Sequence, residues 1–368
     1  MEQSSFDVTR EPRRVMIAMS GGVDSAVAAY LLKRDGYDTL GVTLQMFERE
    51  LLTPEAQRAL PRSSPIDDAR DAADRLGIPH RALNFSNEFC ASVVEPFIET
   101  YRAGGTPNPC VECNRCLKFG KLLDAADALG FPYLATGHYS KIERESGGRY
   151  ILRRAEDMNK DQTYMLWSLS QEQLSRVLFP LGGMTKNEVR EIAGSLGFVS
   201  ANRKDSQDIC FIPDGDYAAF IKHHTGESFP EGDFLDESGN CLGRHKGIIH
   251  YTVGQRKGLG IALGEPMYVS KKDAARNTVT LARNEGLFRR TLKVERANLM
   301  LWDRLDSPVR VTAKVRYHHT PVPATVTQIA DDRLFVEFDE PVRAIAPGQS
   351  FVMYEGDYLA GGGIISDE

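Results

Sequence analysis

The N-terminal half of the chain alternates short apolar runs with longer segments of helical periodicity. The runs predict strands at residues 15–19, 39–44, 81–85 and 133–136, and the periodic segments predict helices at 26–32, 67–76 and 117–129. Two capping boxes, Ser170 with Gln173 and Thr185 with Glu188, mark further helix starts. Strands that alternate with helices form a parallel sheet with helices on both faces. We therefore expect an α/β domain built on a parallel, Rossmann-like sheet.

The C-terminal part shows the period of β-strands instead. Apolar positions from Val309 to Tyr317 alternate with polar and cationic ones. Further strands are predicted at 322–329, 334–338, 351–354 and 359–365. Asp331 and Asp332 separate the first two of these as a hairpin turn. We expect an antiparallel β-barrel here, with a sandwich as the alternative.

A glycine-rich stretch, residues 226–264, separates these two parts and has few helical periods. It predicts a small, mostly β central domain. The expected domains are therefore residues 1–212, 213–285 and 286–368.

The segment from Glu48 to Pro65 is a second irregular stretch, and it contains three prolines. It is longer than most connections between helices and strands, which favours a functional or mobile loop.

Composition narrows the class of protein. Of 368 residues, 42% are hydrophobic and 26% charged, which excludes wholesale disorder. The net charge of −6 excludes a histone-like polycation. We find neither the apolar core of a secretory signal in the first residues nor an apolar run long enough to cross a bilayer. We therefore expect a cytoplasmic protein that makes no membrane contact.

The run from Ser20 to Ser25 lies between a predicted strand and a predicted helix. Gly21 and Gly22 permit a tight turn close to an anion, and the helix N-terminus favours phosphate. Asp24 would either hold this loop or bind Mg²⁺. A plain capped turn is the alternative, but all six residues together resemble the PP-loop of ATP pyrophosphatases, which split ATP into AMP and pyrophosphate.

Cysteines form the second candidate site. Three of six, Cys110, Cys113 and Cys116, fall within seven residues, and Cys210 lies far along the chain. We expect a helix from residue 117 onward whose dipole lowers the pKa of the thiols before it. For Cys90 and Cys241 we favour the role of small buried hydrophobic residues.

Several further motifs follow the PP-loop in order. They are TPNPxxxCN at 106–114, ATGHY at 135–139, NKDQ at 159–162, DS…ICFI at 205–212, GQRKGLG at 254–260 and PGQS at 347–350. With these motifs the chain resembles the tRNA-specific 2-thiouridylases from about residue 13 to its C-terminus. The resemblance implies ATP-dependent adenylation of O2 of the wobble uridine, followed by sulfur transfer to C2 that gives 2-thiouridine, AMP and pyrophosphate. Implied partners are the tRNA anticodon region and a sulfur-donor or persulfide-relay protein, and implied cofactors are ATP and Mg²⁺.

The resemblance also implies roles for individual residues. Cys210 would carry a persulfide, and Cys113 would be the nucleophile that helps release sulfur or closes a disulfide bond with it. The positions that match ATP contacts are Ala18, Met19, Ser20, Gly21, Gly22, Val23, Asp24, Ser25, Leu44 and Gly137. Those that match the stretch against the target base are Asn108, Pro109 and Cys110. Those that match tRNA contacts are His138, Lys160, Asp161, Gln162, Arg316, Tyr317 and Gln349.

One feature departs from a common form of that family. Some members have Asp where this chain has Cys110, and the Cys-x-x-Cys-x-x-Cys spacing also suits an iron–sulfur cluster or zinc. Cys110, Cys113 and Cys210 would hold a [4Fe–4S] cluster with one open iron, as an alternative to the persulfide route. Cys116 belongs to neither arrangement, and a zinc site lacks a nearby histidine. The sequence therefore assigns no metal with certainty.

Positive charge gathers near the C-terminal part. Residues 289–320 carry eight Arg or Lys against three acidic residues. Such a stripe can neutralise RNA phosphates, although a solvated strand face is the alternative. A second basic patch, amid glycines, consists of Arg244, His245, Lys246, Arg256 and Lys257. Tyr317 would either stack on a splayed base or belong to the core.

Two other function classes remain open at this stage. A small-molecule ligase of the PP-loop type would not need the remote cysteine or the cationic β-domain. A non-catalytic RNA-binding or cluster-carrying protein would not need an intact PP-loop.

Overall fold

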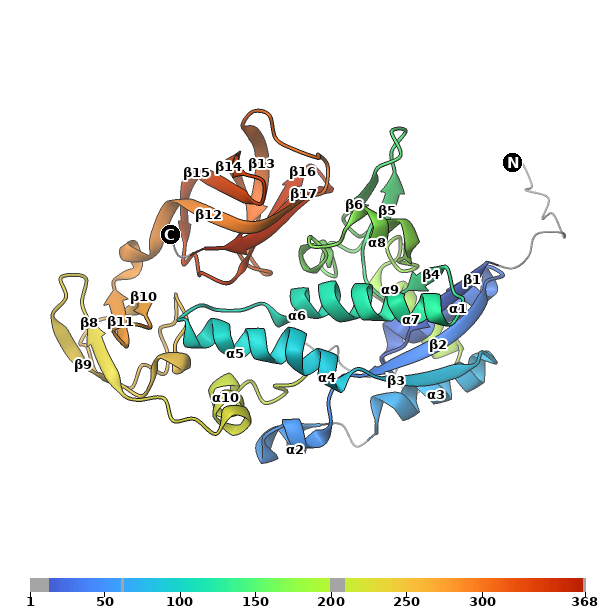
Figure 1. The fold of residues 1–368 in the computed structure, drawn as a ribbon, viewed down its shortest axis with the longest axis horizontal. Helices are drawn as coiled ribbons and strands as arrows, with labels where there is room; N and C mark the ends of the chain where they lie inside the picture. The colour runs from blue at the N-terminus through green and yellow to red at the C-terminus, as the bar shows by residue number, and fades with distance from the viewer. Residues whose placement is uncertain (1–12, 61–62, 199–208, 367–368) are drawn as a thin grey trace.

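The computed structural model describes residues 13–60, 63–198 and 209–366, so the Asp205–Ser206 motif lies outside the described residues. Figure 1 shows three parts: a sheet with helices in blue and green, a small yellow part, and an orange-red barrel. The α/β architecture predicted from the sequence is confirmed, as is the antiparallel barrel.

The first sheet has five parallel strands in the order β3-β2-β1-β4-β7. They are β1 (Arg14–Ala18), β2 (Asp38–Gln45), β3 (His80–Asn84), β4 (Tyr133–Ala135) and β7 (Val177–Leu178). The order in which strands are added changes sides at β1: β2 and β3 lie on one side of it, and β4 and β7 lie on the other. Ligands bind at the carboxyl ends of strands beside such a point.

Helices cover both faces of this sheet. Val15 and Ile17 belong to a core cluster with α1 (Val23–Arg34), α3 (Pro65–Leu76) and α9 (Lys186–Ser195). Met16, the residue between them, packs on the other face with α7 (Leu122–Ala128) and α8 (Gln171–Arg176). This alternation buries both sides of β1 and explains its continuous apolar run. Both predicted capping boxes are present, at α8 and α9.

One continuous helix carries the cysteine cluster. It comprises α6 (Pro109–Glu112), the π-helix η3 (Cys113–Lys121) and α7. The helix begins at Pro109 rather than at residue 117, so the prediction that Cys110 and Cys113 precede it is wrong. Proline at the first helical position explains the earlier start, because a residue there needs no N–H partner.

A second helix runs beside it (Figure 1). It comprises α4 (Ser86–Phe89), the π-helix η2 (Cys90–Val94) and α5 (Glu95–Arg102). The two helices place the segments after β3 and before β4 side by side.

The segment 48–65 is more regular than expected. It contains the 3₁₀-helix η1 (Arg49–Leu51) and α2 (Pro54–Ala59), which Thr53 caps through the Ala56 N–H. Leu52 and Ala56 are fully buried in the core beside α5, so this segment is anchored. Residues 61–62 lie outside the description.

The central part combines a helix with a small sheet. It contains α10 (Tyr217–Thr225), β8 (Gly232–Leu235), β9 (Cys241–His245), η6 (Ile248–His250), β10 (Tyr268–Asp273) and β11 (Thr278–Ala282). The strand order is β10-β11-β8-β9. Cys241 is exposed on β9, which contradicts its predicted role as a buried residue, and Cys90 is only half-buried.

Six antiparallel strands close the C-terminal barrel. After η7 (Asn284–Leu287) come β12 (Phe288–Leu299), β13 (Val309–Lys314), β14 (Val322–Ala330), β15 (Arg333–Arg343), β16 (Ser350–Glu355) and β17 (Tyr358–Ile365). Pairing between β12 and β17 closes the ring, and the predicted hairpin at residues 331–332 joins β14 to β15. The first four residues of β12 are exposed, so no alternation of apolar and polar residues marks the start of this strand. The predicted strand 309–317 ends at Lys314.

The barrel also receives strands from the first part. The hairpin of β5 (Lys141–Arg144) and β6 (Tyr150–Arg153) adds to β17. The short helix η4 (Thr163–Met165) follows, and Tyr164 donates to the Ser350 carbonyl oxygen at 2.8 Å. The barrel is therefore fixed against the helical part. Among the described residues, no helix combines the length and apolar character needed to cross a membrane.

Candidate active site

The turn between β1 and α1 has the geometry of an anion-binding loop. Gly21 has a φ of 74°, in the left-handed region, and Gly22 caps α1 in an extended conformation. The Ser25 hydroxyl donates to the Gly22 carbonyl oxygen and accepts from the Ser20 N–H, each at 3.1 Å. These bonds close the turn at the N-terminus of α1, where the first N–H groups and the helix dipole favour phosphate.

Two neighbouring segments press against this turn. A Cβ atom at Gly21 would lie 2.6 Å from the Pro65 carbonyl oxygen, at the start of α3. A Cβ atom at Gly137, just after β4, would lie 2.9 Å from the Ser25 nitrogen. Both glycines are therefore required by close packing. Gly137, a predicted ATP contact, lies directly against the phosphate loop.

Asp24, in the first turn of α1, is held by a buried lysine. Lys186 Nζ donates to both carboxylate oxygens at 2.7 and 2.8 Å, and the Tyr139 hydroxyl donates to Oδ1 at 2.7 Å. The Lys186 side chain is 5% exposed. Of the two roles predicted for Asp24, this geometry favours holding the loop over binding Mg²⁺. Lys186 was missed because nothing in the sequence marks the first residue of α9 as a partner of α1.

The other predicted ATP residues line the ends of β1 and β2. Ala18 ends β1, and buried Met19 follows it, its carbonyl oxygen accepting from the Thr43 hydroxyl at 2.8 Å. Leu44 is half-buried near the end of β2, and Val23 is buried in the first turn of α1.

Beyond the end of β2 lie three thiols from two distant segments. Cys113 is buried, with Sγ 3.8 Å from the sulfur of Met46, which follows β2. Cys110 precedes it by one helical turn, and both thiols act electrostatically on Cys210. Phe211 anchors the Cys210 segment by packing edge-on against Phe97 at a centroid distance of 5.4 Å. Cys113 belongs to the same buried cluster as Phe211 and Ile212, so the structure brings the segments of Cys113 and Cys210 together.

We call the surroundings of these three thiols, together with the neighbouring phosphate loop, the recess. Cys110 and Cys210 are open to solvent on one side. Protein surrounds them elsewhere, and this burial raises the pKa of both thiols, as it does for Cys113. The expected lowering of the thiol pKa is therefore wrong, because burial disfavours the charged thiolate. At neutral pH the three groups are thiols.

Lys118 supplies the positive charge of this recess, and sequence analysis missed it. A π-helix bonds residue i to i+5, so Lys118 lies one turn after Cys113 on the same face. Its charge opposes burial by lowering the pKa of Cys110, Cys113 and Cys210. Among the described residues it forms no ion pair. The only signal in the sequence was a lysine between the apolar residues 117 and 119.

His138 links this charge to the phosphate loop. It follows Gly137, and its ring packs against Phe119 and Phe179 at centroid distances of 5.6 and 5.8 Å. Burial, with a smaller contribution from Lys118, lowers its pKa well below the usual value, so the ring is neutral. His138 therefore lies between Gly137, which packs against the phosphate loop, and Lys118, which lies near the thiols.

Cys116 faces different surroundings. Its pKa is raised by burial and modified by the charges of Arg115, Glu112 and Arg296. Arg296 also forms an ion pair with Glu112 at 3.2 Å. Cys116 also packs against the buried cluster that contains Cys113, so it is a neighbour of the recess as well as of the barrel.

The segment predicted to lie against the target base is fixed by the barrel. Gln349 Nε2 donates to the carbonyl oxygens of Thr106 and Pro107 at 3.0 and 3.1 Å. Asn108 caps α6 and donates to the Met165 sulfur at 3.7 Å. Pro109, the next residue, is buried. Gln349, a predicted tRNA contact, is thus engaged with the protein backbone.

The other predicted tRNA residues lie at the same junction. The Tyr317 hydroxyl donates to the Asp161 carbonyl oxygen at 3.1 Å, and its ring packs on Tyr164 at 5.7 Å. Gln162 Oε1 accepts from the Tyr139 N–H at 2.9 Å, and Arg316 donates to the Arg343 carbonyl oxygen at 3.3 Å. Lys160 is half-buried beside them. Tyr317 is therefore half-buried and packs against the edge of the core.

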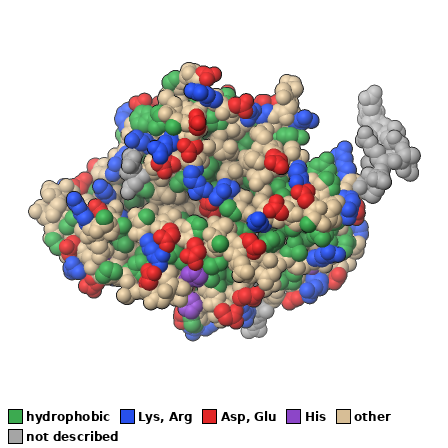
Figure 2. Space-filling model, in the orientation of Figure 1, with side chains coloured by type: hydrophobic (Ala, Val, Ile, Leu, Met, Phe, Trp, Pro, Cys, Tyr) green, Lys and Arg blue, Asp and Glu red, His purple; other side chains and the backbone are tan. Residues whose placement is uncertain are grey.

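The basic stripe is partly neutralised. Four of its eight cations form ion pairs: Arg290 with Glu340, Arg296 with Glu112, Arg304 with Asp306, and Arg310 with Asp339. Figure 2 shows blue and red side chains intermingled on the face drawn. The net positive charge counted from the sequence therefore overstates the electrostatic potential of this surface.

Comparison with known proteins agrees with these features. Three family models match in succession: the tRNA methyl transferase HUP domain at residues 13–214, the tRNA methyl transferase PRC-barrel domain at 218–283, and the aminomethyltransferase beta-barrel domain at 289–365. The tRNA-specific 2-thiouridylase MnmA of Clostridioides difficile is 48% identical over 96% of this chain and 98% of its own length. That of Lachnoclostridium phytofermentans is 47% identical over 96% and 99%.

A solved 4-thiouridine synthetase–RNA complex with bound ATP is 19% identical, covering 55% of this chain and 46% of its own, with a TM-score of 0.34. A likeness of that extent carries no argument.

Proposed function

Since this chain belongs to the tRNA-specific 2-thiouridylase family, we propose that it transfers sulfur to C2 of the wobble uridine of tRNA at the expense of ATP. The observation that carries this proposal is the recess itself. A loop suited to phosphate lies at one end, and thiols from residues 110–113 and 210 lie at the other.

The first step is activation of the uracil. O2 of the extruded base attacks the α-phosphorus of ATP, so that an O2–P bond forms and pyrophosphate leaves. A urea-like carbonyl is a poor electrophile, and this step converts its oxygen into a leaving group. The turn at Gly21 and Gly22 would hold the phosphates, and the Asp24–Lys186 pair would keep the turn in shape.

The second step is sulfur transfer. A persulfide on Cys210 attacks C2 through its outer sulfur, and AMP leaves with the former O2. The Cys113 thiolate then attacks Cys210 Sγ, which breaks the S–S bond, frees the thiocarbonyl and leaves a Cys113–Cys210 disulfide. A dithiol reductant and a sulfur-donor or persulfide-relay protein would restore the starting state.

Lys118 would support this step as a positioning residue. The Cys113 thiol must lose a proton before it attacks Cys210 Sγ, and the Cys210 thiol must lose one before it accepts sulfur, but burial disfavours both thiolates. A cation that lies one π-turn from Cys113 offsets part of that cost.

ATP fits the residues present, because a side chain at Gly137 would fill the space against the phosphate loop. Mg²⁺ would enter with the phosphates rather than on Asp24, whose two oxygens are already engaged by Lys186. Ala18, Met19, Ser20, Val23, Ser25 and Leu44 remain proposed ATP contacts.

A [4Fe–4S] cluster is the alternative route. Two solvent-open thiols and one buried thiol would supply three donors to it, and the segments that carry Cys113 and Cys210 pack in one cluster. When bound, such a cluster would present an open iron to a hydrosulfide. Anaerobic purification with iron and sulfide quantification distinguishes the routes: stoichiometric iron favours the cluster, and its absence favours the persulfide.

The tRNA would approach the junction between the helical part and the barrel. Asn108, Pro109 and Cys110 would face the target base, and His138, Lys160, Asp161, Gln162, Arg316, Tyr317 and Gln349 would surround it. We propose the division into residues 1–212, 213–285 and 286–368, with the last part contacting tRNA. A tRNA substrate also supports a cytoplasmic location.

The experiment that tests this function measures pyrophosphate release and 2-thiouridine formation with and without tRNA. We expect both to require tRNA and ATP. Pyrophosphate release with no dependence on tRNA would favour a small-molecule ligase instead.

A further inference from the structure

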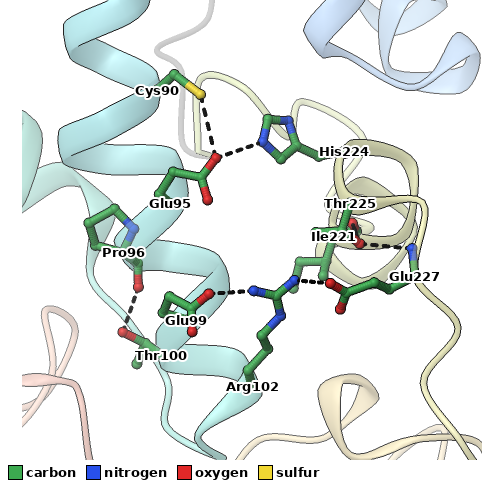
Figure 3. A network of polar contacts seen from close by, with 10 residues as sticks. All are labelled: Cys90, Glu95, Pro96, Glu99, Thr100, Arg102, Ile221, His224, Thr225 and Glu227. Atoms are coloured by element: carbon green, nitrogen blue, oxygen red, sulfur yellow. Dashed lines mark hydrogen bonds and ion pairs between the residues drawn. The ribbon is translucent and has the colours of Figure 1, made fainter.

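Outside the recess, the helices η2, α5 and α10 carry a second group of ionisable side chains. Figure 3 shows the thiol of Cys90, the carboxylate of Glu95 and the imidazole of His224 pointing toward one another. One ligand atom from each of these three side chains lies within 4.8 Å of the other two. Within the described part of the chain, no other group of three His, Cys, Asp or Glu residues meets this criterion. Residue 224 comes from a helix more than a hundred positions away in sequence from the other two.

The distances suit one tetrahedral ion. Cys90 Sγ is 3.8 Å and His224 Nε2 is 3.2 Å from the same Glu95 oxygen. Zinc bonds of about 2.3 Å to sulfur and about 2.0 Å to nitrogen or oxygen place tetrahedral ligands about 3.3–3.6 Å apart. Side-chain shifts of a few tenths of an ångström would therefore close the site.

The surroundings favour a cation. The Cys90 thiol and the His224 ring both contact the same oxygen of Glu95. A thiolate here would lie beside a carboxylate, and a divalent ion would neutralise both. Binding then releases the thiol proton, so affinity should rise with pH.

We propose that Cys90, Glu95 and His224 bind a zinc ion, with the fourth position taken by water. Thiolate, carboxylate and imidazole together suit Zn²⁺ better than Mg²⁺ or Ca²⁺, which prefer oxygen ligands. The Glu95 side chain is 50% exposed, so the ion can enter from solvent.

The position suggests what the ion would do. His224 stacks on Phe220 at 5.9 Å, and Phe220 packs on Phe211 at 5.0 Å, next to Cys210. Cys90 lies on the helix that runs beside the one carrying Cys113. The zinc ion would thus join the two segments that position the reactive thiols, without entering the recess.

Cobalt binding tests this site, because a thiolate–Co²⁺ bond gives an intense near-ultraviolet band. The protein is the full chain with Cys110, Cys113, Cys116 and Cys210 replaced by Ser, which retains Cys90 and Cys241. We expect one equivalent of Co²⁺ to give the band. Cys90→Ser should abolish it, and Cys241→Ser, which removes an exposed thiol, should leave it unchanged.

Two histidine variants sharpen the test. His224→Ala should weaken Co²⁺ binding at least about tenfold, and its neighbour His223→Ala should not. A missing band, or a band that survives Cys90→Ser, would overturn the proposal and leave a hydrogen-bonded cluster only.

If the serine background fails to fold, the native chain gives the same answer. Bound zinc per chain should fall by one equivalent in Cys90→Ser relative to native protein and Cys241→Ser. Equal zinc content in all three would overturn the proposal.

Discussion

The two ends of the recess are held in different ways. At the phosphate loop, a glycine turn, a close approach of Gly137 and the buried Lys186–Asp24 pair fix the backbone. At the thiol end, position depends on side-chain packing, such as Phe211 against Phe97, and burial keeps the thiols protonated. In the proposed function this difference would separate two tasks: the rigid end would bind the nucleotide, whereas sulfur chemistry at the other end would require the thiols to lose their protons.

The largest expected effect tests whether the thiol end alone carries sulfur transfer. Cys113→Ala and Cys210→Ala should each lower 2-thiouridine formation by at least about a thousandfold, as loss of a nucleophile does. Pyrophosphate release and tRNA binding should remain within about threefold. Cys116→Ala, the matched control, should retain activity because the proposed mechanism gives that neighbouring thiol no chemical role.

If both cysteine variants also lost pyrophosphate release, nucleotide activation could not be assigned to the phosphate loop separately from the thiols. The thiols would then be part of the nucleotide site.

The next effect concerns the phosphate loop. Lys186→Met leaves the Asp24 carboxylate, whose side chain is 33% exposed, without its cation. We expect a loss of about 2–3 kcal/mol in the free energy of unfolding, below the value for a fully buried pair because water screens part of the charge. Urea unfolding measures this change.

The double variant Asp24→Asn, Lys186→Met is its control. It should recover at least half of that stability, because no unpaired charge remains. Equal destabilisation of the single and double variants would mean that Lys186 acts through packing alone.

A third, smaller effect tests the charge at the thiol end. Lys118→Met should raise the pKa of the Cys113 and Cys210 thiols further, since the cation favours the thiolate. The thiolate fraction rises with pH, so the profile of iodoacetamide alkylation should move to higher pH by up to about one unit. At a fixed pH below the pKa, alkylation should slow by up to about tenfold.

Lys118→Arg should restore most of the alkylation rate because it keeps the charge. An alkylation profile that is the same in Lys118→Met and the native protein would show that Lys118 does not act on these thiols.

The smallest effect concerns the segment between the two ends. Gln349→Ala removes two hydrogen bonds to the backbone of residues 106–107. We expect a loss of about 1–2 kcal/mol in the free energy of unfolding. If Gln349 only positions this segment, the salt dependence of tRNA binding should stay unchanged while 2-thiouridine formation slows. A large loss of tRNA affinity at unchanged stability would show direct contact instead.

The same contrast explains what could be predicted from the sequence. The phosphate loop was predictable because its glycines, serines and flanking elements are local in the chain. Lys186 and Lys118 were not, because one reaches α1 through tertiary packing and the other gains its position from a π-helix that widens the turn. The pKa direction of the thiols was predicted wrongly, since burial is a property of the fold and not of a helix start.

The barrel shows the same limit. Alternating β13 to β17 were predicted, but β12 was not, because its first residues face solvent on both sides. The anchored helix α2 was hidden by three prolines that suggested an irregular loop.

The most direct measurement is cross-linking of the native protein with dibromobimane, which joins only closely spaced thiols, followed by peptide mass spectrometry. One recess predicts a cross-link between Cys210 and Cys113 or Cys110, with ATP and tRNA changing its yield. Modification of Cys210 with no partner from residues 110–113, in any ligand state, would contradict a shared site for nucleotide and sulfur chemistry.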